Sequence, residues 1–170
     1  GNLVLTLRGD GDVVNYRHQL DLDTAIATTT YERDGVRYRR DVFSSPVDQV
    51  IVVRIASEPA GRINLTAQLR GDRNQAHSNY ATDYFHMDAD GPDSLVVRGK
   101  SADYLGVTGR LRYTSRLRAA VEGGTMTAGD DSLTIRDASV VTFLIAAATN
   151  FVSYRDVSAD PDARVAGVLD

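Results

Sequence analysis

Apolar and polar positions alternate with a period of two through residues 16–55, and the rest of the chain is organised around this stretch. Leu20 and Leu22, for example, alternate with polar neighbours. Because successive side chains of a β-strand point to opposite faces, this rhythm predicts four strands in series. The Asp34-Gly35 pair predicts a hairpin turn, since it tolerates the positive φ that a tight turn requires. Residues 50–55 are apolar enough to be covered on both faces.

The same rhythm predicts further strands over residues 1–8, 61–69, 94–98, 110–121, 125–127 and 133–136. Residues 140–148 are almost continuously apolar, which is typical of a central strand or of a buried helix; the β-branched start favours the strand. Ser158 or Asp160 can cap a helix that has Pro161 in its first turn. The sequence therefore predicts an all-β antiparallel β-sandwich over residues 1–152. A linker and the start of a helix are expected over residues 153–170.

Length and composition narrow the class of protein. A chain of 170 residues can bury a sizeable core as one domain, so the absence of cysteine is no obstacle to folding. Its 19 basic and 23 acidic residues are mixed along the chain and give a net charge of -4. This distribution argues against electrostatic binding of nucleic acid. No stretch approaches the roughly 20 apolar residues of a membrane-spanning helix. We therefore expect neither nucleic acid nor membrane as a partner.

Arginines occupy one face of the predicted strand 110–121, at positions 110, 112, 116 and 118. Such a row is typical of a solvated face with acidic residues on neighbouring strands. The alternative is a face that meets an acidic partner or the edge of another sheet.

Residues 71–91 interrupt the strand rhythm, and long irregular segments are disproportionately functional. The candidates for contact with substrate or with another domain are His77, Asn79, Tyr80, Asp83, Tyr84, His86 and, in the next loop, Tyr104. Aromatic faces beside Asn, Asp and His would suit a sugar. Contact with another domain is favoured over contact with a sugar, and a loop whose polar groups are satisfied locally is the remaining alternative.

We expect no cofactor, no metal and no catalytic residue. His77 and His86 are nine residues apart without a third ligand in register, which argues against zinc. Residues 9–12 alternate glycine with aspartate, but a plain turn is favoured over a calcium loop, because the rest of such a loop is missing. Phosphate loops, nucleophile elbows and HExxH motifs are absent from the sequence. Asp21 and Asp23 share a strand face, which is more typical of solvated or arginine-paired carboxylates than of a catalytic pair.

One long set of residues stands in fixed register: Tyr16, Leu20-Asp21-Leu22-Asp23-Thr24-Ala25, Gly35-Val36, Tyr38, Arg40, Phe43, Asp48-Gln49-Val50 and Val52-Val53-Arg54. In this set the chain resembles the N-terminal β-sandwich of glycoside hydrolase family 95, the α-L-fucosidase-like enzymes. The resemblance continues more loosely through residues 109–124 and 142–150, so it covers most of the chain.

The resemblance implies a supersandwich-like fold that lacks its first strands, which family members supply from a segment before the first residue. It also implies a catalytic (α/α)6 barrel in the same polypeptide. In that barrel a glutamic acid protonates the leaving oxygen and an aspartate activates water. None of those motifs occurs in these residues. Fucosylated or galactosylated glycans are the implied ligands, and an extracellular or periplasmic location in a bacterium is the implied setting.

The leading hypothesis is therefore a non-catalytic N-terminal sandwich of a secreted, fucosidase-like glycoside hydrolase. It would pack on the barrel as a scaffold and lend loops to the rim of the active site. The alternative is a free-standing carbohydrate-binding sandwich that holds glycans through Tyr80, Tyr84 and Tyr104. A purely structural or adhesive β domain is a third hypothesis.

Overall fold

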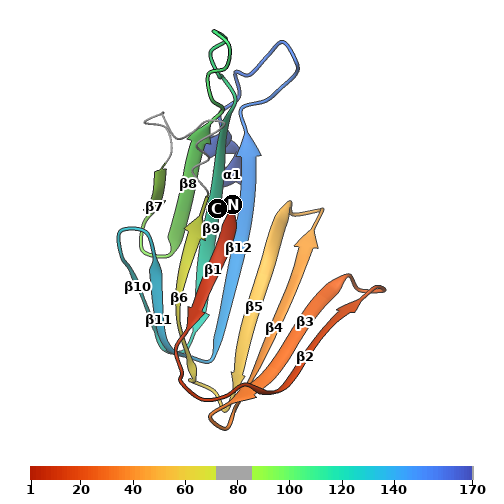
Figure 1. Ribbon diagram of the computed structural model, residues 1–170, viewed down its shortest axis with the longest axis vertical. Helices are drawn as coiled ribbons and strands as arrows, with labels where there is room; N and C mark the ends of the chain where they lie inside the picture. The colour runs from red at the N-terminus through yellow and green to blue at the C-terminus, as the bar shows by residue number, and fades with distance from the viewer. Residues whose placement is uncertain (72–85, 170) are drawn as a thin grey trace.

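The computed structural model describes residues 1–71 and 86–169, which form two antiparallel β-sheets and one short helix (Figure 1). The small sheet has the order β1 (Asn2–Leu7), β6 (Ile63–Arg70), β11 (Leu133–Ala138) and β10 (Thr125–Ala128). The long sheet has the order β2 (Val14–Asp21), β3 (Ile26–Arg33), β4 (Val36–Ser45), β5 (Val50–Glu58), β12 (Val140–Thr149), β9 (Arg112–Glu122), β8 (Ser94–Lys100) and β7 (His86–Ala89). The predicted all-β antiparallel sandwich is confirmed.

The core lies between the two sheets, where side chains from alternate positions of facing strands meet. Phe143 of β12 and Leu117 of β9 are fully buried in one cluster with Leu65 of β6 and Leu133 of β11. Along β6 buried residues alternate with half-exposed ones, as the period of two predicted. Burying each such large apolar side chain contributes roughly 1.5 to 3 kcal/mol, so this cluster is the main source of stability.

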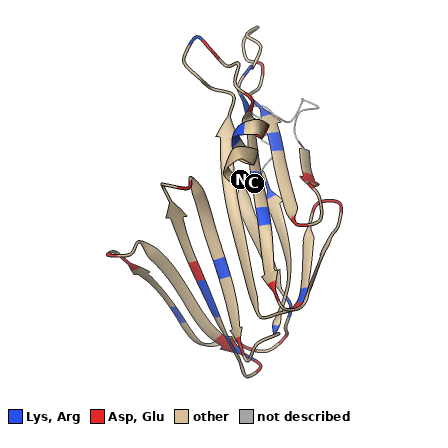
Figure 2. Cartoon of the chain, turned by 180° about the vertical axis from the view of Figure 1, so that it is seen from behind, with Lys and Arg blue, Asp and Glu red and all other residues tan. Residues whose placement is uncertain are grey.

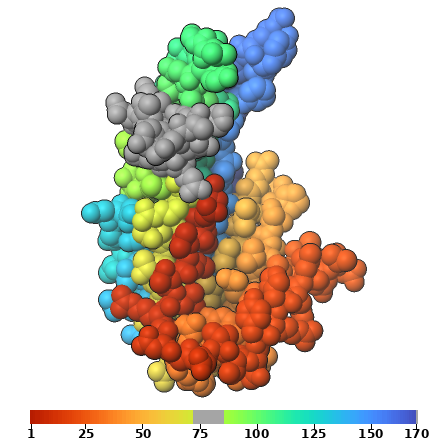
Figure 3. All heavy atoms as spheres, viewed as in Figure 1, coloured from red at the N-terminus to blue at the C-terminus, as the bar shows by residue number. Residues whose placement is uncertain are grey.

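The small sheet covers only part of the long sheet. Strands β5, β12, β9 and β8 contribute buried side chains to the core, whereas β2 is exposed along its whole length. In Figure 1, β2 to β5 fan away from β1, and in Figure 3 the atoms of β3 to β5 lie beside β1 with no second layer of described residues in front of them. We call the inner side of β2, β3 and β4 the open inner face. Its side chains are Tyr16, His18, Leu20, Ala27, Thr29, Tyr31, Tyr38, Arg40 and Val42.

Helix α1 (Pro161–Leu169) begins where the sequence predicted. Asp160 Oδ1 accepts hydrogen bonds from the backbone nitrogens of Asp162 at 2.9 Å and Ala163 at 3.3 Å. These bonds satisfy N–H groups that have no partner inside the helix. Pro161, which has no N–H, occupies the first helical position.

The helix lies on the outer face of the long sheet, as the view from behind shows (Figure 2). Leu169 packs in one cluster with Ala146 of β12, whose small side chain lets the helix approach closely. Arg98 Nε donates to Asp162 Oδ1 at 2.8 Å, and Arg118 Nη1 donates to the carbonyl of Leu169 at 2.8 Å, so both ends of the helix are held. With the core on one side and α1 on the other, β12 is the two-sided central strand that its apolar run predicted.

Two local predictions can be compared directly with the structure. The hairpin at Asp34-Gly35 is confirmed, since both residues have positive φ, 52° and 73°. The prediction that residues 71–91 are irregular is wrong for His86–Ala89, which pairs with β8 as the edge strand β7. Met87 and Ala89 pack against the core from this strand. Four residues are too few for an alternation to be distinguished from a loop.

The arginine face predicted for β9 has acidic neighbours. Arg116 pairs with Asp90, and Arg118 Nε lies 3.1 Å from Asp93 Oδ2. Both aspartates come from the turn between β7 and β8 rather than from an adjoining strand. Within the described residues, no helix is long and apolar enough to cross a membrane.

Candidate functional site

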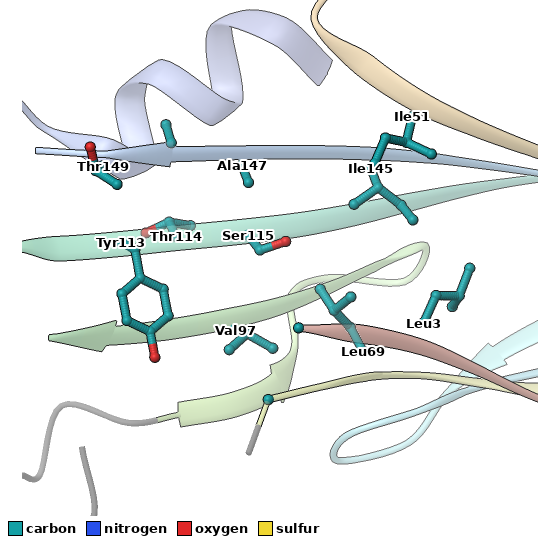
Figure 4. A pocket seen from close by; sticks show the side chains of 13 residues that line it. Leu3, Ile51, Leu69, Val97, Tyr113, Thr114, Ser115, Ile145, Ala147 and Thr149 are labelled. Carbon is teal, nitrogen blue, oxygen red and sulfur yellow. The ribbon is translucent and has the colours of Figure 1, made fainter. Parts of the chain in front are cut away.

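A cavity of about 740 Å³ lies between the sheets beside β1 (Figure 4). Its walls are mostly aliphatic or small, with Leu3, Leu69 and Ile145 among them, and Tyr113 and Ser115 supply hydroxyl groups. Among the described residues that line this cavity, none carries a carboxylate or an imidazole. Glycoside hydrolysis uses a pair of acidic groups, which the described lining of this cavity does not supply.

The carboxyl groups of the described residues have pKa values that are shifted in one direction only. Where their pKa is shifted, at Asp21, Asp41, Asp93 and Asp156, it is shifted downward. Hydrogen bonds from the backbone nitrogens of Thr24, at 3.1 Å, and Asp23, at 2.9 Å, lower the pKa of Asp21. A general acid needs the opposite, a raised pKa. The Asp21 side chain therefore accepts the hydrogen bonds of the turn that follows β2.

Two loops project from one end of the sandwich, where β9 begins and β12 ends (Figure 1). They are residues 101–111, between β8 and β9, and residues 150–160, between β12 and α1. Large apolar side chains on these loops are exposed, Leu105 by 85% and Tyr154 by 82%. We call the set the tip surface; it consists of Tyr104, Leu105, Val107, Phe151, Val152 and Tyr154.

Hydrogen bonds fix the shape of the first loop. Tyr104 and Val107 exchange two backbone hydrogen bonds of 2.9 Å across a tight turn in which Leu105 has a φ of 48°. At the base of the loop, a β-carbon on Gly109 would lie 2.1 Å from the carbonyl oxygen of Ser101, so only glycine fits there. The loop therefore presents its apolar side chains from a defined backbone.

The second loop is held in a similar way. Ser153 and Asp156 exchange backbone hydrogen bonds of 3.0 Å, and the guanidinium carbon of Arg155 lies 4.9 Å from the centre of the Tyr154 ring. Arg164 of α1 donates to the carbonyl of Phe151 at 2.8 Å. The helix thus anchors the loop that carries half of the tip surface.

Asn150 ties the bases of the two loops together. Its side chain is buried, and its Oδ1 accepts a hydrogen bond of 2.8 Å from the backbone nitrogen of Arg112. Its Nδ2 donates to the carbonyls of Arg110 at 3.0 Å and Val157 at 2.8 Å. A buried amide with both ends satisfied is a rigid connection, so Asn150 fixes the two loops relative to each other.

The structure describes Tyr104 and His86 among the residues that the sequence suggested for contact with substrate or another domain. Tyr104 lies on the tip surface. His86 is exposed at the start of β7 and lines a polar hollow with Arg98 and Asp162, next to the N-terminus of α1. The other candidates lie outside the described residues: His77, Asn79, Tyr80, Asp83 and Tyr84. Their roles remain predictions.

Sequence reasoning missed Asn150 and the second loop. The available signal was a polar residue that ends the long apolar run of β12 and is followed at once by Phe151 and Val152. Apolar residues directly after a strand are normally predicted to be buried with that strand. In the structure, Phe151 and Val152 are instead exposed to solvent.

Comparison with known proteins agrees with this architecture. The family model described as "Glycosyl hydrolase family 65, N-terminal domain" matches residues 1–154. Alpha-L-fucosidase 2 from Arabidopsis thaliana is 27% identical over 150 residues, which cover 81% of this chain and 17% of that protein. A solved structure described as a kojibiose phosphorylase from the human microbiome is similar with a TM-score of 0.57 and 11% identity. That likeness covers 98% of this chain and 23% of the other, and it concerns the fold alone.

The chain therefore spans less than a quarter of the length of these two proteins, 17% and 23%. The resemblance seen in the sequence is confirmed at a coarser level than family 95, as the β-sandwich that accompanies glycosidases. Since the matching model extends over residues 1–154, this chain belongs to the glycosyl hydrolase family 65 N-terminal domain family.

Proposed function

We propose that the chain is the non-catalytic N-terminal sandwich of an exported, fucosidase-like glycoside hydrolase of the family 95 type. In this proposal the sandwich docks on an (α/α)6 catalytic barrel of the same polypeptide through its tip surface and lends loop residues to the rim of the active site. The similarity to Alpha-L-fucosidase 2 supports the substrate class, an α-L-fucoside.

The observation that carries the proposal is the combination of exposed apolar side chains with a hydrogen-bonded backbone on the tip surface. Soluble proteins rarely expose such groups together unless another surface covers them. A backbone that is already ordered loses little conformational entropy on binding, which favours tight association.

The test is the affinity of the 170-residue chain for the separately produced catalytic region of its parent polypeptide, measured by calorimetry. We expect Tyr104→Ala and Tyr154→Ala each to weaken binding about tenfold, because buried aromatic anchors dominate interface energies. Val47→Ala is the control, since Val47 is an exposed apolar residue in the turn between β4 and β5, away from the tip surface, and its replacement should leave the affinity unchanged.

Unchanged affinity in both tyrosine variants would disprove docking through the tip surface. A parallel titration with fucosylated and galactosylated oligosaccharides separates the proposal from a free-standing carbohydrate-binding module. Heat of binding to the isolated chain that disappears in Tyr104→Ala would favour that alternative.

A further inference from the structure

The long sheet ends in two edge strands of different length, β2 and β7. Strand β7 has four residues, and the backbone nitrogen of Ala89 already donates to the carbonyl of Asp130 at 2.7 Å. Strand β2 has eight residues, and no described strand pairs with its outer edge, at the margin of the fan in Figure 1. About half of the backbone N–H and C=O groups of such a strand point away from its one neighbour, so they can bond to another extended backbone.

The side chains of β2 do not shield this edge. Among the described strands, β2 alone has every residue exposed, with Tyr16 exposed by 63% and Leu20 by 58%. Natural edge strands are often protected by lysine or proline, and β2 contains neither. Its irregularity at Asn15, which has a φ of 53°, comes before the stretch Arg17–Asp21 that pairs regularly with β3. These five residues can therefore accept a second neighbour.

The charges of this stretch are placed symmetrically. Arg17 and Asp21 stand two positions on either side of Gln19. All three point to the outer face, because they alternate with the residues of the open inner face. If two β2 strands pair antiparallel about Gln19, Arg17 of each copy lies opposite Asp21 of the other on one face. Opposite charges in directly opposite positions stabilise a strand pair.

Neighbouring registers lose this match. A pair centred on His18 would place Asp21 opposite Asn15, and a pair centred on Leu20 would place it opposite Gln19. Charge complementarity thus favours the pair centred on Gln19.

Both charged groups are available for the contact. The turn after β2 uses only Oδ1 of Asp21, which accepts from the nitrogens of Asp23 at 2.9 Å and Thr24 at 3.1 Å. Within residues 1–71 and 86–169, Arg17 has no ion pair. An arginine of a second copy can therefore reach Oδ2 of Asp21 without breaking the turn.

From these observations we infer that a second copy of this chain pairs with the outer edge of β2, antiparallel and centred on Gln19, so that two long sheets become one. Such an interface is self-complementary, as a two-fold axis requires. On the inner face Leu20 comes opposite His18 of the other copy, and at the ends of the stretch Tyr16 comes beside Leu22. A ladder of this length buries little area, so we expect a weak dimer whose affinity falls as salt rises.

A cysteine cross-link tests the register. The chain contains no cysteine, so Gln19→Cys introduces a single thiol at the centre of the pair. Directly opposite residues have Cα atoms about 4.5 to 5.5 Å apart, a separation that a disulfide can span. We expect mild oxidation of the folded Gln19→Cys variant to give a covalent dimer. Val47→Cys, an exposed position away from β2, is the control and should give only background cross-linking.

A charge reversal tests the ion pairs. In sedimentation experiments on the 170-residue chain, Arg17→Asp should weaken dimerisation at least about tenfold, because it places two carboxylates opposite each other at both ends of the ladder. Arg37→Asp is the matched control, since Arg37 is an exposed arginine on the outer face of β4. It changes the net charge equally and should leave the dimer intact.

Three results would overturn the inference. The first is a chain that sediments as a monomer at every concentration. The second is equal cross-linking of Gln19→Cys and Val47→Cys, or equal weakening by Arg17→Asp and Arg37→Asp. The third is a parent polypeptide in which Gln19→Cys forms no cross-link between copies, since another segment would then occupy the edge. None of these results involves the tip surface, so the docking test can fail or succeed independently.

Discussion

The long sheet has two halves that were both predicted as strands from the sequence and that differ in how far they are buried. In the half formed by β12, β9 and β8, inward side chains such as Phe143 and Leu117 are fully buried by the small sheet. In the half formed by β2, β3 and β4, inward side chains such as Leu20 remain exposed. Strand β9 of the first half and strand β2 of the second both alternate apolar with polar residues. Alternation in one strand therefore indicates which of its faces is apolar. It does not indicate which other strands pack on that face, because that depends on the rest of the fold.

The largest expected contrast is between two leucines on the inward side of the two halves. Leu117→Ala should lower the free energy of unfolding by about 3 kcal/mol, because it leaves a cavity in a packed core. Leu20→Ala should lower it by less than about 0.5 kcal/mol in the isolated chain, since little apolar contact is lost. Urea denaturation of both variants measures the difference. Similar losses would mean that the two halves are equally packed.

A smaller effect is expected at the end of the covered half, where the loops are anchored. Asn150→Ala should lower the free energy of unfolding by about 2 kcal/mol, because the nitrogen of Arg112 and the carbonyls of Arg110 and Val157 lose their partner. Asn64→Ala is the control, since Asn64 is less buried and its bonds to Asp137 are 3.2 and 3.4 Å long. Chemical shifts of Tyr104 and Tyr154 should change only in the Asn150 variant. Unchanged chemical shifts of Tyr104 and Tyr154 in Asn150→Ala would refute the role of Asn150 as the anchor of the two loops.

The smallest expected effect on the free energy of unfolding comes from removing the hydrogen bonds of two aspartates. One aspartate lies on each half of the long sheet. On the open half, a hydrogen bond from Arg39 holds the pKa of Asp41 below its ordinary value of 3.8. On the covered half, burial acts to raise the pKa of Asp93, but hydrogen bonds from Ser94 and Arg118 together lower it. A lowered pKa in the folded state stabilises the fold above about pH 4, and this contribution is lost as the pH falls further.

Asp41→Asn and Asp93→Asn should therefore each cost about 0.5 to 1 kcal/mol at pH 7 and less at pH 3, measured by urea denaturation at both values. Comparable losses in the two halves would show that they differ in apolar burial alone. A pH-independent loss would rule out the ionised carboxylate as the stabilising form.

The elements of the fold were largely predictable from the sequence, because two-residue alternation and turn residues are local signals. The cap at Asp160 and the hairpin at Asp34 followed from the same local chemistry. The short edge strand β7 was not predictable, since four residues carry too little pattern. Only part of the tip surface was predictable. Tyr104 was identified as a candidate because it lies in a predicted loop. Asn150 was not identified, because it anchors the loops through a hydrogen bond from the backbone nitrogen of Arg112, 38 residues away. Such long-range hydrogen bonds leave no periodic trace in a sequence.

In the proposed function the described residues support catalysis by another part of the polypeptide and perform none themselves. Hydrolysis of an aryl α-L-fucoside tests that role most directly, with the 170-residue chain alone compared with its parent polypeptide at equal concentration. We expect no turnover above buffer by the chain alone and turnover by the parent. Hydrolysis by the chain alone that persists through repeated purification would contradict a non-catalytic sandwich.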